Sequence, residues 1–439
     1  MIALRGSTRA PEIATRAILS NAGSLVGSVA VTSLLGLPFW WIAARAFPAA
    51  AVGSAATLVS AMTLLGTLGM LGLGTLLTGE LPRQALERAS LIATALTFAA
   101  GAGLGFGLVF GLVAPRPLGL EEVAGRPGAA LLFAIGVALS AVTMVIDQAV
   151  IGLLRGDVQL RRNIVFAASK LLFLGLVAVA TLRERGLTIY ATWVAGLGIS
   201  LVWLALVASR EGARLHQCRP RWTLFRDWRR PALEHHLLNL AIQVPAFVMP
   251  LVVTATISVT ASAYYYTASL IAGFLSYAAF ALTLALYAVG AQDEARLTQA
   301  LRFTLRIAFG VILGANVVLI FGSRLILHVF GPAYAANAAT VLRIQGIAAC
   351  LIIVKDHYIA IARIRGKLLK AGVLCAVGAV LEIGLASAGG AWRGLTWVPL
   401  GVVAALAIEV CVMSPAVLRE LNPNLRRPAV RHPLRVPGR

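Results

Sequence analysis

Residues 128–162 read GAALLFAIGVALSAVTMVIDQAVIGLLRGDVQLRR, and this stretch establishes the fold class of the chain. Its first part, 129–154, is an almost uncharged apolar run that is long enough to cross a bilayer as one α-helix. Three arginines follow, at positions 155, 161 and 162. Because the cytoplasmic loops of membrane proteins are enriched in Lys and Arg, the stretch predicts both a membrane span and its orientation.

The alternation of apolar runs and basic loops continues along the whole chain. Of its 439 residues, 59% are hydrophobic and only 13% are charged, and the mean hydropathy is +0.87. A soluble domain of this size needs a much more charged surface, so we predict an all-α integral membrane protein with about twelve transmembrane helices. The predicted spans are 20–43, 52–78, 89–114, 129–154, 163–182, 187–209, 232–257, 264–289, 301–322, 335–361, 367–388 and 394–415.

The basic residues also assign the two sides of the membrane. The N-terminus, every second loop and the C-terminus hold 27 of the 38 Lys and Arg residues, whereas the intervening loops hold 7. By the positive-inside rule both termini are expected in the cytoplasm, which makes the chain a multi-pass protein of the cell inner (plasma) membrane. The net charge of +21 lies in short loops and tails, which favours membrane lipids as partners and argues against nucleic acid.

Two segments in different halves of the chain resemble each other. Asp147 in span four leads to Arg155-Gly156, and Asp356 in span ten leads to Arg365-Gly366, at an offset of 209 to 210 residues. Six spans in each half predict parallel repeats, with chance similarity between apolar helices as the alternative. The predicted units are an N-terminal lobe (1–209), a basic cytoplasmic linker (210–231), a C-terminal lobe (232–415) and a basic cytoplasmic tail (416–439).

Local composition predicts two unusual helices. In the linker, Trp222, Phe225 and Trp228 recur every three residues, a spacing that favours an amphipathic helix lying on the inner leaflet. In span two, the glycines between 66 and 74 predict a bend.

Acidic side chains inside a bilayer are costly, and they usually face a protein interior or a wet cavity. Asp147, Asp356, Glu382 and Glu409 are therefore candidates for coupling transport to Na⁺ or H⁺, with a purely structural role as the alternative. Asp147 and Lys170 are predicted at a similar depth on antiparallel neighbouring spans. This placement allows a buried Asp147–Lys170 ion pair, with a structural pin between the two helices and a role in ion coupling as the alternatives.

Arginine is the residue type best suited to bind a phosphate inside a span, because its planar guanidinium forms bidentate hydrogen bonds. Arg343 in span ten and Arg45 just beyond span one are therefore candidates for substrate binding. Snorkelling of their charges to the membrane interface is the alternative. Asn239 and Gln243 lie in span seven, a helix with two prolines that is expected to bend, and we include them as cavity candidates.

The motifs of common enzymes and metal sites are missing. The sequence has no Walker loop, no HExxH, no GxSxG and no CxxC pair, so we predict no catalytic residue, no metal site and no cofactor. Glu121 and Glu122 do lie in a predicted outer loop, where a membrane glycan ligase or glycosyltransferase would want acids. Such an enzyme is the alternative to a transporter.

Six motifs spread over the whole chain point in one further direction. They are Trp40–Arg45, Val52-Gly53, Gly79–Arg83, Phe330–Tyr334 followed by Leu342-Arg343, Arg363–Lys367 and Glu234–Leu240. Together they resemble the bacterial polysaccharide-biosynthesis flippases of the multidrug/oligosaccharidyl-lipid/polysaccharide (MOP) exporter superfamily.

The resemblance implies two six-helix lobes around a central cavity (a MATE-like MOP fold) and an alternating-access mechanism. The implied substrate is a lipid-linked oligosaccharide on a polyprenyl-pyrophosphate carrier for cell-surface polysaccharide synthesis, with a polysaccharide polymerase and glycosyltransferases as further partners. Arg45, Lys170, Arg343 and Lys355 would line a cationic cavity for the diphosphate. An ion-coupled drug or metabolite antiporter of the same superfamily is the alternative.

Overall fold

The computed structural model describes residues 36–82, 87–180, 185–211, 220, 222–292 and 297–422, and its regular elements there are helices. A helical segment at 36–46 comes first. It is followed by α2 (Ala49–Gly69), α3 (Leu73–Glu80), α4 (Arg88–Val113), α5 (Pro127–Gly152), α6 (Gly156–Val179), α7 (Gly186–Arg210), α8 (Trp222–Thr256), α9 (Val259–Gln292), α10 (Leu297–His328), α11 (Pro332–Ile364), α12 (Leu368–Arg393) and α13 (Trp397–Leu421).

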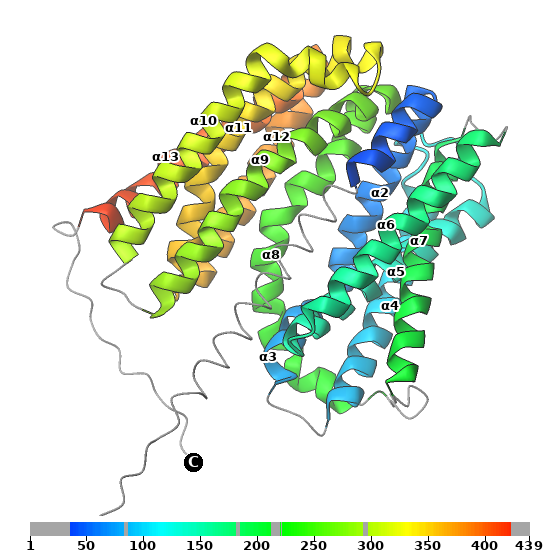
Figure 1. Cartoon of the computed structure of the whole chain (residues 1–439), viewed down its shortest axis with the longest axis horizontal. Coiled ribbons are helices and arrows are strands. Elements are labelled where there is room, and N and C mark those ends of the chain that lie inside the picture. The colour runs from blue at the N-terminus through cyan, green and yellow to red at the C-terminus, as the bar shows by residue number, and fades with distance from the viewer. Residues whose placement is uncertain are drawn as a thin grey trace, which may run out of the picture.

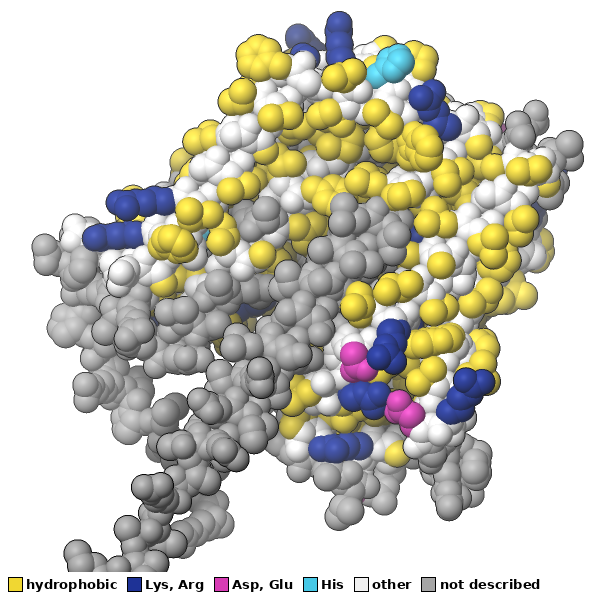
Figure 2. Space-filling view, in the orientation of Figure 1, with side chains coloured by type: hydrophobic (Ala, Val, Ile, Leu, Met, Phe, Trp, Pro, Cys, Tyr) yellow, Lys and Arg dark blue, Asp and Glu magenta, His cyan; other side chains and the backbone are white. Residues whose placement is uncertain are grey.

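Eleven of the described helices are long and apolar enough to cross a membrane, which confirms the predicted all-α membrane fold. Of predicted span one, residues 20–35 lie outside the described ranges. Apolar side chains cover the flanks of the helices, and Lys and Arg gather near the helix ends (Figure 2). This is the distribution that a hydrocarbon environment with two polar boundaries requires.

The helices form two bundles (Figure 1). In that view the N-terminal helices up to α7 lie together on one side, α9 to α13 lie on the other, and α8 runs between them. Helix α8 packs against α12 in the C-terminal lobe and also against α2 in the N-terminal lobe. It is continuous from Trp222 to Thr256, so the helical part of the predicted linker and span seven form one helix. Its location on the inner leaflet stays a prediction.

Predicted span two is two helices. The chain breaks between Gly69 and Leu73, where Leu71 has φ 50° and Gly72 has φ 73°. Glycine adopts this left-handed conformation without steric cost, whereas leucine does not. The break confirms the predicted bend, and it leaves the short helix α3 beside α5.

The two lobes are joined at the predicted outer end. The Thr57 hydroxyl on α2 lies 2.6 Å from the Thr254 hydroxyl on α8 and 3.1 Å from the Ser262 hydroxyl on α9. Trp41 Nε1 and Arg45 Nε both donate to the Val329 carbonyl oxygen, at 3.0 and 2.9 Å. We call this last pair of bonds, between segment 36–46 and the α10–α11 turn, the outer contact.

The two halves also resemble each other at the predicted inner end. Helices α5 and α11 both finish in a left-handed residue, Leu154 and Gly366. In each turn the next N–H group donates to the carbonyl five residues back, from Arg155 at 2.9 Å and from Lys367 at 2.8 Å. The turns match at an offset of 212, so the predicted register of the repeat is shifted by two residues at this point.

An arginine at each of these turns binds a glutamate at the end of its own lobe. Arg155 forms two hydrogen bonds of 3.1 and 3.0 Å with Glu211 after α7. Arg365 forms two of 2.9 and 2.8 Å with Glu420 of α13. We call these bidentate pairs the N-lobe clasp and the C-lobe clasp.

Candidate functional site

A cavity of about 320 Å³ with both polar and apolar lining lies in the N-terminal lobe, and Tyr277 of α9 contributes to its wall from the other lobe. Helices α2, α5, α6 and α7 supply the rest of its lining. The lining residues are Met62, Thr63, Ser140, Thr143, Met144, Asp147, Gln159, Arg162, Asn163, Phe166, Trp193, Leu197 and Tyr277. We call this space the N-lobe cavity.

Arg162 is the principal charged group of the N-lobe cavity. Two turns into α6, its side chain is only 3% exposed, and Nη2 donates to Asp147 Oδ2 at 2.9 Å. Nη2 also donates to the side-chain oxygen of Asn163. Within the described part of the chain, Nε and Nη1 of Arg162 have no hydrogen-bond partner. A guanidinium carries five N–H donors, so this one keeps unpartnered buried donors in a residue that belongs to the cavity lining.

Acceptors and hydroxyl groups lie in the same cavity. Thr143 Oγ1 and Gln159 Oε1 are buried and also lack partners among the described residues. Buried polar groups of this kind are usually satisfied by protein, water or a ligand. The cavity therefore offers a balanced Arg162–Asp147 ion pair, in which Asp147 Oδ1 is also unpartnered among the described residues, together with neutral hydrogen-bonding groups.

The predicted Asp147–Lys170 ion pair is wrong, because Asp147 pairs with Arg162. Helix α6 begins at Gly156 and not at residue 163 as predicted, so Lys170 lies fourteen residues into the helix. Eight residues separate Arg162 from Lys170, about 12 Å along the axis. Asp147 lies at the same depth in the membrane as Arg162 and not at the depth of Lys170.

Lys170 is enclosed by aromatic rings. Its Nζ lies 3.8 Å from the centroid of the Trp193 ring, 4.6 Å from Phe166 and 5.2 Å from Phe39. Cation–π attraction replaces an ion pair here, since no carboxylate in the described ranges bonds to this ammonium. Phe166 and Trp193 also line the N-lobe cavity, so Lys170 lies behind its aromatic wall.

The C-terminal lobe holds a buried ion cluster. Lys355 Nζ of α11 lies 2.7 Å from Glu382 Oε1 of α12 and 2.8 Å from Glu409 Oε2 of α13. All three side chains are less than 9% exposed. We call these residues the C-lobe triad. The sequence predicts Lys355 at the substrate and the two glutamates at an ion, and the structure unites them in one site.

Gly378 makes room for the triad. A methyl group added at this position of α12 would overlap with the carboxylate of Glu409. Gly384, further along the same helix, has open space beside it. The packing of Glu409 against α12 therefore depends on one particular glycine.

The remaining predicted residues are dispersed. Arg45 is exposed and belongs to the outer contact, and Arg343 donates to the Ser323 hydroxyl at 2.8 Å inside the C-terminal lobe. Gln243 reaches the Asn239 carbonyl at 3.4 Å, and neither residue lines the N-lobe cavity. Asp356 lines a separate small pocket with Arg363 and Tyr287.

The predicted common cationic cavity is not formed, because its four candidate residues have four different sets of partners. These candidates are Arg45, Lys170, Arg343 and Lys355.

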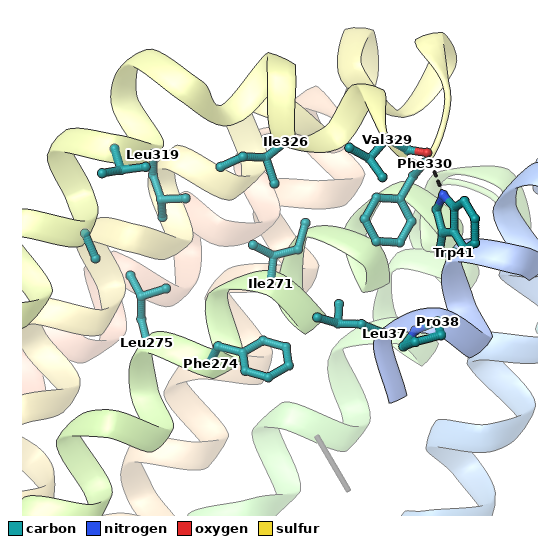
Figure 3. Close-up of a pocket in the computed structure, with 12 residues that line it drawn as sticks. Leu37, Pro38, Trp41, Ile271, Phe274, Leu275, Leu319, Ile326, Val329 and Phe330 are labelled. Carbon is teal, nitrogen blue, oxygen red and sulfur yellow. Dashed lines mark hydrogen bonds between the residues drawn. The ribbon is translucent and has the colours of Figure 1, made fainter. Parts of the chain in front are cut away.

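A second, apolar cavity of about 750 Å³ lies between the lobes (Figure 3). It is lined by Leu37, Pro38 and Trp41 of segment 36–46 and by residues of α9, α10 and the turn after α10. Figure 3 shows Trp41 and Phe330 near one end of it, where the outer contact closes the gap between lobes, and Leu275 and Leu319 near the other. We call it the apolar groove.

Two features of the site escape the sequence reasoning. Arg162 is counted with its neighbour Arg161 among the cytoplasmic loop charges, although Arg161 is exposed and Arg162 is buried. A signal for it exists, because only Asn163 separates Arg162 from the apolar run of residues 164–168 in span five. The apolar groove has no such signal, since its side chains are of the same types as those that face lipid.

Solved structures with this arrangement of helices are transporters of the MOP superfamily. A multidrug resistance MATE family transporter in an inward-facing conformation matches with a TM-score of 0.67 and 16% identity, over 89% of this chain and 94% of that one. An outward-facing MATE family transporter matches at 0.61 and 15% identity, over 94% and 96%. The lipid II flippase MurJ, inward closed, matches at 0.70 and 12% identity, over 90% and 88%.

The likeness lies in structure and is not detected in sequence. No protein-family model matches the chain, and no curated protein matches it either. At identities of 12 to 16% the solved structures establish the architecture that the sequence motifs predict. This chain has the MATE-like fold of the MOP superfamily transporters.

Proposed function

We propose that this protein is an alternating-access transporter that moves a lipid-linked oligosaccharide with a polyprenyl-pyrophosphate anchor from the cytoplasmic to the outer leaflet. One observation carries the proposal: a buried arginine with unused donors faces a cavity whose wall includes a residue of the other lobe. Its fold is that of membrane transporters, which makes a translocated substrate the expected ligand.

Arg162 is suited to hold the diphosphate. Asp147 fixes the guanidinium through Nη2 and leaves Nε and Nη1 for a ligand. Charge-assisted hydrogen bonds from arginine to phosphate are short and strong, and salt screens them little at a buried site. The neutral groups of Thr143 and Gln159 suit hydroxyl groups of the first sugar.

The apolar groove suits the lipid part of such a substrate. Its lining is apolar, and it follows the boundary between the lobes (Figure 3). An isoprenoid chain in this groove would remain in apolar surroundings while its polar end is inside the protein. A carrier lipid loses no hydrophobic stabilisation on entering a space of this kind.

The state of the molecule is consistent with loading from the cytoplasm. All the hydrogen bonds between lobes described above lie at the predicted outer end. The inward-facing MATE structure also matches better than the outward-facing one, at TM-scores of 0.67 and 0.61. A transporter that binds its substrate on the cytoplasmic side and releases it on the outer side is in the inward-facing state before the substrate binds.

Export of a cationic drug or metabolite is the second candidate function. Met62, Met144, Phe166, Trp193 and Tyr277 give the N-lobe cavity soft and aromatic walls, and Asp147 supplies an anion. Such walls bind flat cations well. Glycan ligation has less support, because the Glu122 oxygens accept hydrogen bonds from the Gly186 and Leu187 N–H groups and so cap α7.

The decisive experiment is depletion of the protein in its native host. A flippase defect makes lipid-linked oligosaccharide accumulate on the cytoplasmic face, which a membrane-impermeant glycan-modifying enzyme measures in vesicles of both orientations. Accumulation at the outer face alone would indicate a ligase. Unchanged lipid-linked glycan, together with lost efflux of fluorescent cations, would indicate the drug exporter.

A further inference from the structure

We propose that the N-lobe cavity recognises a zwitterionic head group, namely a phosphate whose attached sugar carries a free amino group. The proposal rests on the function argued above and names a substrate class for it, in which an ammonium replaces one hydroxyl of the first sugar. Three properties of the cavity lead to it: its charges, its unpartnered polar atoms and its size.

The charged groups in the lining of the N-lobe cavity balance each other. Two lining residues are charged, Arg162 and Asp147, and they are joined at 2.9 Å. A ligand with negative charge alone is attracted by the arginine and repelled by the aspartate, and for a ligand with positive charge alone the signs are reversed. A ligand that carries both charges a short distance apart is attracted by both residues.

The unpartnered donors of the cavity suit a phosphate. Arg162 Nη2 is bonded to Asp147 Oδ2, whereas Nε and Nη1 have no hydrogen-bond partner among the described residues. Each of these nitrogens can donate to a different phosphate oxygen, and such charge-assisted bonds are stronger than neutral ones. The negative part of the ligand is therefore expected at the guanidinium.

The unpartnered acceptors suit an ammonium. Asp147 Oδ1, Gln159 Oε1 and Thr143 Oγ1 are buried and lack partners within the described ranges. Thr143 lies one turn before Asp147 on α5, and the Gln159 side chain lies beside the Asp147 carboxylate. An ammonium has three N–H donors, one for each of these oxygens. A hydroxyl or an acetamido group has one donor and would leave two buried acceptors unsatisfied, which is costly.

One small head group can reach both sets of atoms. Gln159 and Arg162 are three residues apart on α6 and so share a face of that helix. Arg162 also bonds to Asp147 directly, which places the donors next to the acceptors. In a 2-amino sugar 1-phosphate, the nitrogen and the phosphate are attached to neighbouring carbon atoms. The cavity volume of about 320 Å³ lies at the small end for ligand pockets, so it suits one sugar with its phosphates.

Lys170 keeps the aromatic wall from competing for the ligand's ammonium. Its Nζ lies 4.6 Å from the Phe166 ring and 3.8 Å from the Trp193 ring, and both rings line the cavity. A ring that already attracts one cation is a poorer partner for a second, because the two cations repel each other. Asp147 is therefore the preferred partner of a positive group in the cavity.

The first test measures the binding of soluble probes to the purified full-length protein by isothermal titration calorimetry. Glucosamine 1-phosphate carries both charges and should bind at least about tenfold more tightly than glucose 1-phosphate, because it gains an ionic contact with Asp147. It should exceed N-acetylglucosamine 1-phosphate, which lacks the positive charge, and glucosamine, which lacks the phosphate, by the same factor. Equal affinity for the zwitterion and any of the other three probes would overturn the proposal, and so would no measurable binding of the zwitterion.

The second test changes the charge balance of the cavity. Asp147→Asn leaves Arg162 without its counter-ion, so affinity for glucosamine 1-phosphate should fall at least about tenfold, while affinity for glucose 1-phosphate should stay equal or rise. A merely structural role of Asp147 predicts a loss for both probes, and this result would contradict the proposal. Asp157→Asn is the matched control and should change neither affinity, since Asp157 is half-exposed, pairs with Arg155 and lies outside the cavity lining.

A milder variant covers the case in which Asp147→Asn does not fold, as judged by size-exclusion chromatography. Thr143→Val removes one of the three acceptors and keeps the shape of the side chain. It should weaken the binding of glucosamine 1-phosphate severalfold and leave that of glucose 1-phosphate unchanged. Unchanged affinity for both probes would count against the ammonium site.

Failure of this proposal is distinguishable from failure of the flippase proposal. Equal binding of glucosamine 1-phosphate and glucose 1-phosphate, with lipid-linked glycan accumulating on the cytoplasmic face after depletion, would refute the zwitterionic head group and leave the flippase proposal intact. Selective binding of glucosamine 1-phosphate, with normal lipid-linked glycan after depletion, would instead refute the flippase proposal alone.

Discussion

The two lobes carry ion clusters of opposite character. In the N-terminal lobe, Asp147 and Arg162 balance each other at the wall of an interlobe cavity, and the arginine keeps unused donors. In the C-terminal lobe, Lys355 is held by Glu382 and Glu409 inside the helix bundle, with one negative charge in excess. The first arrangement belongs to the lining of a cavity, and the second is enclosed by three helices. Similar helix bundles therefore hold buried charges in two ways, as a balanced pair at a cavity wall in one lobe and as an unbalanced cluster inside the other.

The largest effect on stability is expected when the C-lobe triad loses its cation. Lys355→Ala leaves two buried carboxylates unpaired, which should cost about 3–5 kcal/mol. The double variant Lys355→Ala with Glu409→Gln leaves one carboxylate and should recover part of the loss. Thermal melts of the purified variants in a sodium-free buffer check both. Equal losses in the single and double variants would mean that the triad does not act as a unit.

Removal of Arg162 should mainly abolish transport. Arg162→Ala removes the donors at the cavity wall and leaves Asp147 without its partner, so we expect at least a tenfold loss of activity, about 1.4 kcal/mol of substrate binding. Arg161→Ala is the matched control, because Arg161 is the adjacent residue and is exposed. Surface polysaccharide per copy of protein is the measurement. A similar loss in both variants would place the effect outside the cavity.

Two glycines on one helix test the packing of the triad. Gly378→Ala pushes a methyl group into the Glu409 carboxylate and should destabilise the protein by about 1–3 kcal/mol. Gly384→Ala meets open space and should be neutral or slightly stabilising, since alanine favours the helix. Thermal unfolding of both variants side by side decides the point. If Gly378→Ala is as stable as Gly384→Ala, then α12 can move away from the Glu409 carboxylate without a loss of stability.

The smallest expected effects separate the two clasps. Glu420 and Arg365 are 14% and 21% exposed, so Glu420→Gln should cost about 1–2 kcal/mol. Glu211 and Arg155 are about half exposed, so Glu211→Gln should cost less. Chemical denaturation of both variants at neutral pH makes this comparison. An equal loss in both would mean that exposure does not decide their strength.

The N-lobe clasp also has a defined pH dependence. Hydrogen bonds from the Arg155 guanidinium lower the pKa of Glu211 below its ordinary value. A carboxyl whose pKa is lowered by folding stabilises the fold above its unfolded pKa, and this contribution is lost as pH falls through the folded value. The difference in stability between wild type and Glu211→Gln should therefore vanish in acid. A difference that grows in acid would contradict this assignment.

Sequence patterns predict the helices of this protein well and their rotations poorly. The apolar run at 129–154 fixes α5 because length and hydropathy alone define a span. Lys355, Glu382 and Glu409 are each recognisable as charges inside spans, but their meeting depends on the rotation of three helices about their axes. The same limit separates Arg161 from Arg162, since adjacent helical residues point about 100° apart. Only the packed structure shows which of the two enters the cavity.

The outer contact has a consequence for how the molecule opens. Trp41 and Arg45 come from one segment and end on a single backbone oxygen, that of Val329. The acceptor belongs to the main chain, so substitution of the Val329 side chain leaves the acceptor in place. Because both donors depend on one atom, a single displacement of the α10–α11 turn releases them together. Complete separation at this end also requires the Thr57 hydroxyl to part from Thr254 and Ser262.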